Sequence, residues 1–348
     1  MIRRKFSLFI ISFLIFALFF NICGEVVTLT TVGIGAMGAF GFFTVFECCG
    51  TPWINTNIAH RLEEEVEERL YGQHMAQRIV IKAVRAHITK QKPNKALVLS
   101  FHGWTGTGKN YLTQMIANAV YKKGFKSRFV HLSVATFHFP SLNEIDIYKR
   151  QLRSWIAGNL TECERSMFVF DEADKLPLQL LDAIVPYVEF YDNVNGIDAR
   201  KSIFIFLSNG GANLIAQKAL DHYNKGQPRE QISFKELEEL MQLSAYNEGE
   251  GGLKRSRIIS KHLVDYFVPF LPLERRHVIM CFKDYLKSRN VIYTPEQLEN
   301  LADSIQYFPK GTPIFSTSGC KLVERKADYM YEDVIKEVHK ASQYKDEI

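Results

Sequence analysis

The chain has 348 residues and a mass of 40.1 kDa, a length that suits two domains of roughly 100–200 residues each. Hydrophobic residues make up 47% of the chain and charged residues 23%, which excludes a disordered, collagen-like or linker-dominated protein. The net charge of +5 includes Arg3, Arg4 and Lys5, so the rest of the chain is close to neutral and no nucleic acid is expected as a partner.

The first 24 residues have the pattern of a secretory signal peptide. Three basic residues at 3–5 precede an apolar run over 6–20, and the small residues Cys23 and Gly24 follow it. This order of basic, apolar and small residues is typical of a segment that is removed after export. We therefore expect residues 1–24 to be a cleaved signal peptide, with an uncleaved signal anchor as the alternative.

A second apolar segment is expected over residues 25–47. Its 21 residues from Val26 to Phe46 carry no charge. That length is enough to span a bilayer as a helix, but four glycines weaken a helix there. Two interpretations stay open, a transmembrane helix and a hairpin or helix held in one leaflet from the lumenal side. The second is favoured, and in both cases the segment is expected to associate with the membrane surface.

Two further signals point to the lumen of the endoplasmic reticulum. Residues 345–348 read Lys-Asp-Glu-Ile, one aliphatic change from the Lys-Asp-Glu-Leu retention signal. Asn159 begins an Asn-Leu-Thr triplet, which is a glycosylation acceptor in the lumen. An oxidising lumen permits disulfides, and the pairing among the cysteines beyond residue 24 is left open. These cysteines are Cys48, Cys49, Cys163, Cys281 and Cys320.

Alternating strand and helix patterns occupy the body of the chain. Two amphipathic helices are expected first, one with Leu62, Val66 and Leu70 on its apolar side and one spanning about 76–88. Short apolar runs bounded by turn residues then predict four strands. These runs lie at 96–101, 128–134, 167–170 and 202–207. Strands separated by helices predict an α/β fold with a parallel sheet flanked by helices.

The chain becomes mainly helical after residue 272. Helical patterns cover 274–288, 295–305 and 331–344. We therefore expect a large domain over 48–272 and a smaller, mainly helical domain over 273–348.

A glycine-rich loop follows the first predicted strand and opens a helix over 110–121. The loop fits the pattern G-x-x-x-x-G-K, with Asn110 where Ser or Thr is usual. Its backbone N–H groups and the helix terminus supply partial positive charge to phosphates, and Lys109 adds a full charge. The residues expected to bind the nucleotide are Gly103, Trp104, Thr105, Gly106, Thr107, Gly108, Lys109 and Asn110.

Polar residues at the ends of two later strands complete a predicted ATP site. Asp171 is expected to hold Mg²⁺, and Glu172 to orient and deprotonate the attacking water. Asn110 is a candidate for the metal shell through its amide oxygen or through a water. Asn209 is expected to contact the γ-phosphate or that water. These residues should meet at the carboxyl edge of the sheet, where open α/β sheets bind ligands.

Together these motifs resemble those of AAA+ ATPases related to Clp proteins, and of the torsin family in particular, from Cys48 to the end of the second domain. The segments that carry the resemblance are 103–110, 134–140, 168–172, 207–209, 265–272 and Gly319-Cys320-Lys321. The asparagine after Lys109 and the Gly-Cys-Lys triplet are typical of torsins among AAA+ proteins.

The resemblance implies roles that the spacing alone does not give. It implies an AAA+ large domain and a small domain whose Lys321 is a second sensor of the γ-phosphate. It assigns Tyr71, Gly72, Gln73 and His74 to the adenine side of the site. It also implies a disulfide between Cys281 and Cys320.

One departure from the Clp-type pattern has mechanistic consequences. Leu263 stands where those relatives carry an arginine finger, and Lys261 and His262 are poor substitutes for a planar guanidinium. Several other arginines stay open as candidates: Arg255, Arg257, Arg275 and Arg276. In the torsin family the missing group comes from lumenal domains of transmembrane activators in the endoplasmic reticulum and nuclear envelope, so the resemblance implies such a partner and slow ATP hydrolysis without it.

Three functions follow as hypotheses. The first is an activator-dependent ATPase that remodels protein or membrane assemblies in the lumen of the endoplasmic reticulum and nuclear envelope, as a homo-oligomer or filament. The second is a nucleotide-gated scaffold or membrane-shaping oligomer in which hydrolysis is incidental. The third, a small-molecule kinase, is disfavoured by Asn209 and by the helical second domain.

Overall fold

The computed structural model describes residues 27–29, 43–45, 47–55, 57–247 and 251–332. The predicted signal peptide, most of the second apolar segment, the expected helix beyond Glu332 and the carboxyl-terminal tetrapeptide lie outside these residues. The two ends of the apolar segment pair as antiparallel strands, β1 (Val27–Leu29) with β2 (Phe43–Val45). The membrane association expected for the segment stays a prediction. Within the described chain, no helix has both the length and the apolar character needed to cross a bilayer.

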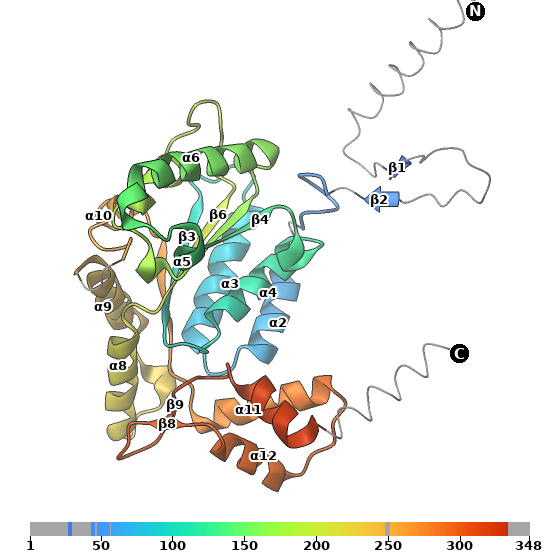
Figure 1. The fold of residues 1–348 in the computed structure, drawn as a ribbon, viewed down its shortest axis with the longest axis vertical. Helices are drawn as coiled ribbons and strands as arrows, with labels where there is room; N and C mark the ends of the chain where they lie inside the picture. Colours follow the sequence, from blue (N-terminus) through green and yellow to red (C-terminus); the bar gives the residue numbers. More distant parts are fainter. Residues whose placement is uncertain (1–26, 30–42, 46, 56, 248–250, 333–348) are drawn as a thin grey trace, which may run out of the picture.

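A five-stranded parallel sheet forms the centre of the large domain (Figure 1). Its spatial order is β4-β5-β6-β3-β7, and all four pairs are parallel, so each connection between successive strands is a crossover. The bounds are β3 (Leu97–Gly103), β4 (Val130–Val134), β5 (Met167–Asp171), β6 (Ile203–Ser208) and β7 (Tyr266–Phe270). The expected parallel α/β fold is confirmed.

The strand β7 was not among the strands predicted from the sequence. It pairs with β3 on one side only, with Phe101 opposite Val268 and His102 opposite Pro269. Pro269 has no N–H to donate to a sheet ladder, and proline is tolerated in a strand mainly at the edge of a sheet. Pro269 therefore weakens the strand pattern of residues 266–270.

The sheet is buried on both faces, and alternate side chains of each strand enter different cores. Phe168 and Phe204 stack at 4.9 Å on one face, whereas Val169 and Ile205 lie in the core of the other. This alternation is the two-residue period of a strand. Because both faces are covered, the inner strands β3, β5 and β6 are mainly apolar, which is why they were predictable as short apolar runs. The edge strand β4 is less buried.

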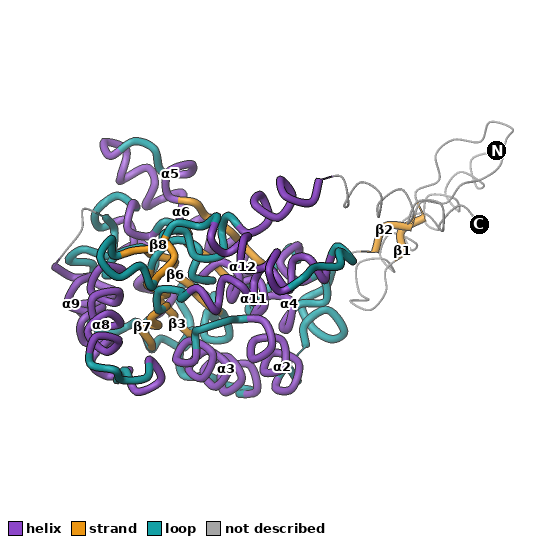
Figure 2. The backbone as a smooth tube through the Cα atoms, turned by 90° about the horizontal axis from the view of Figure 1, so that it is seen from below, coloured by secondary structure: helices purple, strands orange, loops and turns teal. Residues whose placement is uncertain are grey.

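Two layers of helices cover the sheet (Figures 1 and 2). One layer contains α2 (Ala59–Arg69), α3 (His74–Thr89) and α4 (Lys109–Val120). The other contains α6 (Ile145–Glu162), α7 (Val185–Val188), α8 (Ala212–Asn224), α9 (Phe234–Asn247) and α10 (Arg257–Ser260). A short helix, α5 (Ala135–His138), follows β4. In α2 the buried positions are Leu62 and Val66, as the sequence pattern predicted.

The small domain has its own apolar core at the carboxyl-terminal end of the chain. Two helices, α11 (Arg275–Ser288) and α12 (Pro295–Asp303), pack together. The two-residue strands β8 (Tyr307–Phe308) and β9 (Phe315–Ser316) pair next to them. A last helical stretch begins at Val323 and continues to Glu332, the end of the described chain. Figure 1 shows this domain at the bottom of the view, below the sheet.

Candidate functional site

The glycine-rich loop lies between the end of β3 and the start of α4. Gly103, Gly106 and Gly108 have φ angles of 155°, 72° and 106°, and the last two lie in the left-handed region that favours glycine. A side chain at Gly103 would come within 2.5 Å of the Phe270 carbonyl oxygen. The loop is thus shaped by glycine at its two ends and middle, and α4 begins directly at Lys109.

Lys109 is turned back into the loop. Its ammonium donates to the carbonyl oxygens of Gly103 at 2.7 Å and Trp104 at 2.9 Å. It also donates to the Asn209 side-chain oxygen at 2.9 Å. Burial lowers the pKa of Lys109 to about 8, although nearby carboxylates, chiefly Asp174, act in the opposite direction. The partners of the Lys109 ammonium are neutral oxygens. A charged phosphate oxygen in the loop would form a stronger hydrogen bond with the ammonium and could replace them.

Asp171 ends β5 beside the start of α4. One of its oxygens accepts a hydrogen bond from the Asn110 side-chain nitrogen at 3.0 Å, and the other accepts the backbone N–H of Glu172 at 2.8 Å. The two residues expected in a metal shell are therefore adjacent, with the amide nitrogen of Asn110 turned to the carboxylate. A carboxylate and an amide suit Mg²⁺, which binds through one or two protein oxygens and keeps water and phosphate oxygens as its other ligands. The residues present fit this ion.

Glu172 follows Asp171 in a left-handed backbone conformation, with φ 55°. That conformation is uncommon for a residue other than glycine. Its carboxylate accepts a hydrogen bond from the Thr136 hydroxyl at 2.6 Å and pairs with the Lys175 ammonium at 2.5 Å. The Lys175 hydrogen bond first, and the Thr136 hydrogen bond second, hold the pKa of Glu172 below its usual value. Both carboxylate oxygens are thus engaged by protein groups.

Asn209 lies directly after β6, next to Lys109 at the start of α4. Besides accepting from Lys109, it donates its backbone N–H to an Asp174 oxygen at 3.0 Å. The buried His102, on β3, is within 3.0 Å of the Gly210 carbonyl oxygen and 2.7 Å of the Ser100 hydroxyl. Burial lowers the pKa of His102 to about 4, so its ring is neutral at physiological pH. A cavity of about 280 Å³ adjoins Asn209 and Asp174.

The small domain lies directly on the phosphate loop. The Cys320 backbone N–H donates to the Gly106 carbonyl oxygen at 3.0 Å. The Trp104 indole N–H donates to the Thr317 carbonyl oxygen at 2.8 Å, and its ring stacks on Phe308 at 5.5 Å. A side chain at Gly106 would come within 1.9 Å of the Ser318 carbonyl oxygen and 3.2 Å of the Lys321 Cβ atom. Lys321, expected as the second sensor, therefore begins beside the loop.

The structure contains the Cys281–Cys320 disulfide that the family resemblance implied, and a second one between Cys49 and Cys163. The first connects α11 to the residue that hydrogen-bonds Gly106, so it fixes the segment that covers the phosphate loop. The second connects the start of the large domain to the residue after α6. The sequence left the pairing of Cys49 and Cys163 open.

The segment assigned to the adenine side joins α2 to α3 and contacts both domains. The buried Gln73 side chain donates to the carbonyl oxygens of Thr107 at 3.0 Å and Leu271 at 2.9 Å, and accepts the Leu271 N–H at 2.8 Å. Tyr71 donates to an Asp284 oxygen on α11 at 2.5 Å. The Gly72 carbonyl oxygen accepts from Arg229 at 2.8 Å.

His74, the last residue of that segment, begins α3. Its Nε2 atom is buried without a hydrogen-bond partner in the described chain. Burial, with Arg229 as the next cause, lowers the pKa of His74. The segment thus combines Gln73, whose contacts support the loop, with His74, one ring nitrogen of which has no hydrogen-bond partner among the described residues.

Leu263, the position of the expected arginine finger, is buried, with 1% of its surface exposed. The neighbouring Lys261 pairs with Glu189. Two of the other candidates for an arginine finger form ion pairs in or next to the small domain. Arg275 pairs with Glu299 and Asp303, and Arg276 pairs with Glu274. Asn159 lies within α6, where its side-chain nitrogen donates to the Trp155 carbonyl oxygen at 2.8 Å.

Three residues of the site had no role in the sequence-based account. Thr136 and Lys175 hold Glu172, and Asp174 holds the backbone of Asn209. Asp174 and Lys175 lie in the short turn Ala173–Lys175 directly after Glu172, so their proximity could have been suspected. Thr136 follows a strand that is adjacent to β5 only in space, and the sequence gives no sign of that contact.

Comparison with known proteins identifies the family. The sequence model described as Torsin matches residues 43–170, and that described as the Torsin-1A C-terminal domain matches residues 273–331. A torsin-like protein of Caenorhabditis elegans is 43% identical over 307 residues, which cover 86% of each chain. Human Torsin-3A is 38% identical over 286 residues, or 81% of this chain and 72% of that protein.

Among solved structures, the Saccharomyces cerevisiae Hsp104–ADP complex matches with a TM-score of 0.58 at 17% identity. The match covers 81% of this chain and 48% of that chain, and at this identity it shows a common fold. The expectation of family drawn from the motifs is confirmed, and the chain belongs to the torsin family of AAA+ ATPase-type proteins.

Proposed function

We propose that this protein binds ATP at the loop around Lys109 and hydrolyses it slowly unless a partner supplies a cation. The observation that carries this proposal is the convergence of Lys109, from the loop and helix after β3, with Asp171 and Asn209 at the ends of β5 and β6. The Lys109 ammonium and the Asn209 side-chain oxygen are 2.9 Å apart. A lysine ammonium, a carboxylate and an amide brought together at one edge of a parallel sheet indicate a triphosphate site more strongly than the loop motif alone.

The residues would divide the work as follows. Lys109 and the N–H groups from Gly103 to Lys109 hold the β- and γ-phosphates. Asp171 and Asn110 would hold Mg²⁺, which neutralises charge on the phosphate oxygens when it is bound. Glu172 accepts the proton of the attacking water after it leaves Thr136 and Lys175. Asn209 orients that water or the γ-phosphate.

The remaining assigned residues would sense which nucleotide is bound. Lys321 reaches the γ-phosphate from the small domain, whose position depends on the contacts of Trp104 and Cys320 with the loop. Tyr71, Gly72, Gln73 and His74 bound the adenine side, with Trp104, Thr105 and Thr107 completing the loop. The Cys281–Cys320 disulfide couples α11 to this arrangement.

Slow turnover follows from the position of Leu263. A buried leucine cannot provide a positive charge to the site of a neighbouring subunit. An arginine that contacts the transferred phosphate in the transition state increases the rate of hydrolysis by about 10³–10⁵-fold. We infer that the lumenal domain of a transmembrane activator in the endoplasmic reticulum or nuclear envelope provides it. The energy of hydrolysis would be used to remodel protein or membrane assemblies in that lumen. The active form would be a homo-oligomer or filament held at the membrane through residues 26–46.

The signal peptide pattern and the Lys-Asp-Glu-Ile terminus support the lumenal location. ATP binding tests the site itself. Equilibrium dialysis with ATP and Mg²⁺ should show binding to the wild type and to Glu172→Gln. Lys109→Ala should lose about 100-fold or more in ATP affinity, because it removes the positive charge that contacts the β- and γ-phosphates. Equal affinity of Lys109→Ala and the wild type would reject the site.

The scaffold function stays as a second candidate, because Glu172 is held away from a base role by Thr136 and Lys175. In cells that lack the protein, Glu172→Gln restores function under the scaffold account and does not under the ATPase account. Lys109→Ala restores function under neither. Both accounts therefore share the nucleotide site and differ on turnover.

A further inference from the structure

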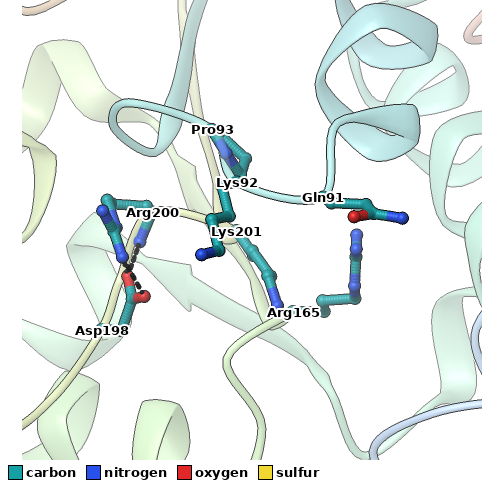
Figure 3. A pocket seen from close by; sticks show the side chains of 7 residues that line it. All are labelled: Gln91, Lys92, Pro93, Arg165, Asp198, Arg200 and Lys201. Atoms are coloured by element: carbon teal, nitrogen blue, oxygen red, sulfur yellow. Dashed lines mark hydrogen bonds and ion pairs between the residues drawn. The ribbon is translucent and has the colours of Figure 1, made fainter. Parts of the chain in front are cut away.

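A basic pocket lies at the end of the large domain opposite the phosphate loop. Its volume is about 410 Å³, and Figure 3 shows side chains from three separate loops around it. Lys92 comes from the loop before β3, Arg165 from the loop before β5, and Arg200 and Lys201 from the loop before β6. One acid, Asp198, lines it as well. The lining residues therefore carry more positive than negative charge.

The register of the sheet explains why these loops meet. Leu97 and Met167, the first residues of β3 and β5, both lie opposite Ile203, the first residue of β6. The amino ends of the three strands are therefore side by side. The phosphate loop is at the other end of β3, about 20 Å away for a seven-residue strand. The pocket is thus separate from the nucleotide site.

The cations of the pocket are not all neutralised by neighbouring acids. Arg200 pairs with Asp198 and Asp192, and Lys201 pairs with Glu164 at 2.6 Å. Arg165 donates to the Ile88 carbonyl oxygen at 3.3 Å. Among the residues that the structure describes, no carboxylate forms an ion pair with Arg165 or with the exposed Lys92. Two positive charges therefore remain available to a ligand.

The same end of the domain carries further lysines and the attachment of the apolar segment. Lys122 and Lys123 are exposed and lie over the Trp53 ring at 4.8 and 5.4 Å. Trp53 belongs to the stretch that directly follows the apolar segment. That stretch is fastened by the disulfide from Cys49 to Cys163, only two residues before Arg165. The apolar segment ends at residue 46, immediately before this attachment.

We propose that this basic face, formed by Lys92, Lys122, Lys123 and Arg165, docks on the phosphate headgroups of an anionic membrane. The inference rests on the membrane association of residues 26–46 proposed above. If that segment enters a bilayer, its attachment at Cys49 leaves the large domain at the membrane surface with this face toward the lipid. The small domain and the phosphate loop then face away from the membrane, where partners can reach them.

Vesicle flotation of the full-length protein tests the proposal. Binding to phosphatidylcholine vesicles is compared with binding to vesicles that also contain phosphatidylserine. The wild type should prefer the anionic vesicles, and the double variant Lys92→Gln/Lys123→Gln should lose about 25-fold of that preference, at roughly fivefold for each basic residue near a charged surface. Both lysines are exposed, so the variant should fold. The preference should also fade between about 0.1 M and 1 M salt, as screening shortens the Debye length.

A matched control is Lys283→Gln/Lys287→Gln, two exposed lysines on α11 in the small domain. This control should keep the wild-type preference. Lys109→Ala should also keep it, so that failure of ATP binding and failure of membrane docking can be told apart. Equal binding of the wild type to both kinds of vesicle, or equal loss in the control variant, would overturn the proposal. Competition by inorganic phosphate beyond that of chloride at equal ionic strength would also overturn it, since the pocket would then hold a small phosphate.

Discussion

The Thr136 hydroxyl and the Glu172 carboxylate are 2.6 Å apart, although 36 residues separate them in the sequence. This hydrogen bond, with the Lys175 ion pair, occupies the carboxylate that the site would need as a base. A base that is hydrogen-bonded to a donor and paired with a cation is a weaker proton acceptor, in agreement with the lowered pKa of Glu172. Both carboxylate oxygens of Glu172 are therefore held by protein groups.

The first prediction concerns this contact. Thr136→Val keeps the shape of the side chain and removes the donor, so Glu172 should turn more readily to the attacking water. Phosphate release in the absence of a partner should rise roughly three- to tenfold, since a hydrogen bond to a charged group is worth about 1.5–3 kcal/mol and part of it is replaced by water. Thr89→Val, which removes an exposed hydroxyl at the end of α3, is the control. A fall in rate to that of Glu172→Gln would show that Thr136 assists the base.

The second prediction concerns pH. Lys109 has its pKa lowered to about 8 by burial, whereas in the unfolded chain it titrates near 10.5. Between these values the unfolded chain binds more protons than the folded one, so the free energy of unfolding of the nucleotide-free protein should rise with pH across this window. ATP needs the charged ammonium, so its dissociation constant should increase above about pH 8. Lys109→Met should abolish this pH dependence of binding, and an unchanged dependence would contradict the assignment.

The third prediction concerns the support of the phosphate loop. Gln73→Ala leaves the Thr107 and Leu271 backbone groups without the partners that the buried amide provides. Unpaired buried groups cost about 1–3 kcal/mol, so the free energy of unfolding in urea should fall by roughly 2–4 kcal/mol in total. Gln217→Ala, on the exposed side of α8, should change it by less than about 0.5 kcal/mol. Equal effects of the two changes would mean that Gln73 does not support the loop.

The fourth prediction concerns the Cys49–Cys163 disulfide. It closes a loop of 114 residues, and its loss in Cys49→Ser/Cys163→Ser should lower the free energy of unfolding by about 2–4 kcal/mol. ATP affinity should stay within about twofold of the wild type, because the disulfide lies at the opposite end of the sheet from Lys109. A large loss of affinity with unchanged stability would contradict this separation of roles.

Much of this architecture was open to prediction from the sequence. The three inner strands β3, β5 and β6 were predictable because strands buried on both faces are mainly apolar runs. The phosphate loop was predictable because Gly103, Gly106 and Gly108 have fixed spacing around Lys109. The strand ends carrying Asp171 and Asn209 followed from the rule that parallel strands bring their carboxyl ends together. The pairing of Cys281 with Cys320 came from the family resemblance, not from the residues themselves.

Other features depend on contacts between distant segments and left no local signal. The edge strand β7 contains Pro269, which weakens its strand pattern. Thr136 reaches Glu172 only because β4 and β5 are neighbours in the sheet. The basic pocket draws Lys92, Arg165 and Lys201 from three loops, each of which alone is an ordinary charged surface. Such sites follow from strand order, which the sequence does not state.

The rate of phosphate release from ATP tests the central claim most directly. It should be measured for the full-length protein alone, and with the lumenal domain of a membrane partner captured by Glu172→Gln in ATP. The account predicts slow release alone and an increase of about 10³-fold or more with the partner, at the lower end of what a supplied arginine contributes. That increase should vanish in Glu172→Gln. Rapid release by the protein alone, or an increase that survives Glu172→Gln, would contradict it.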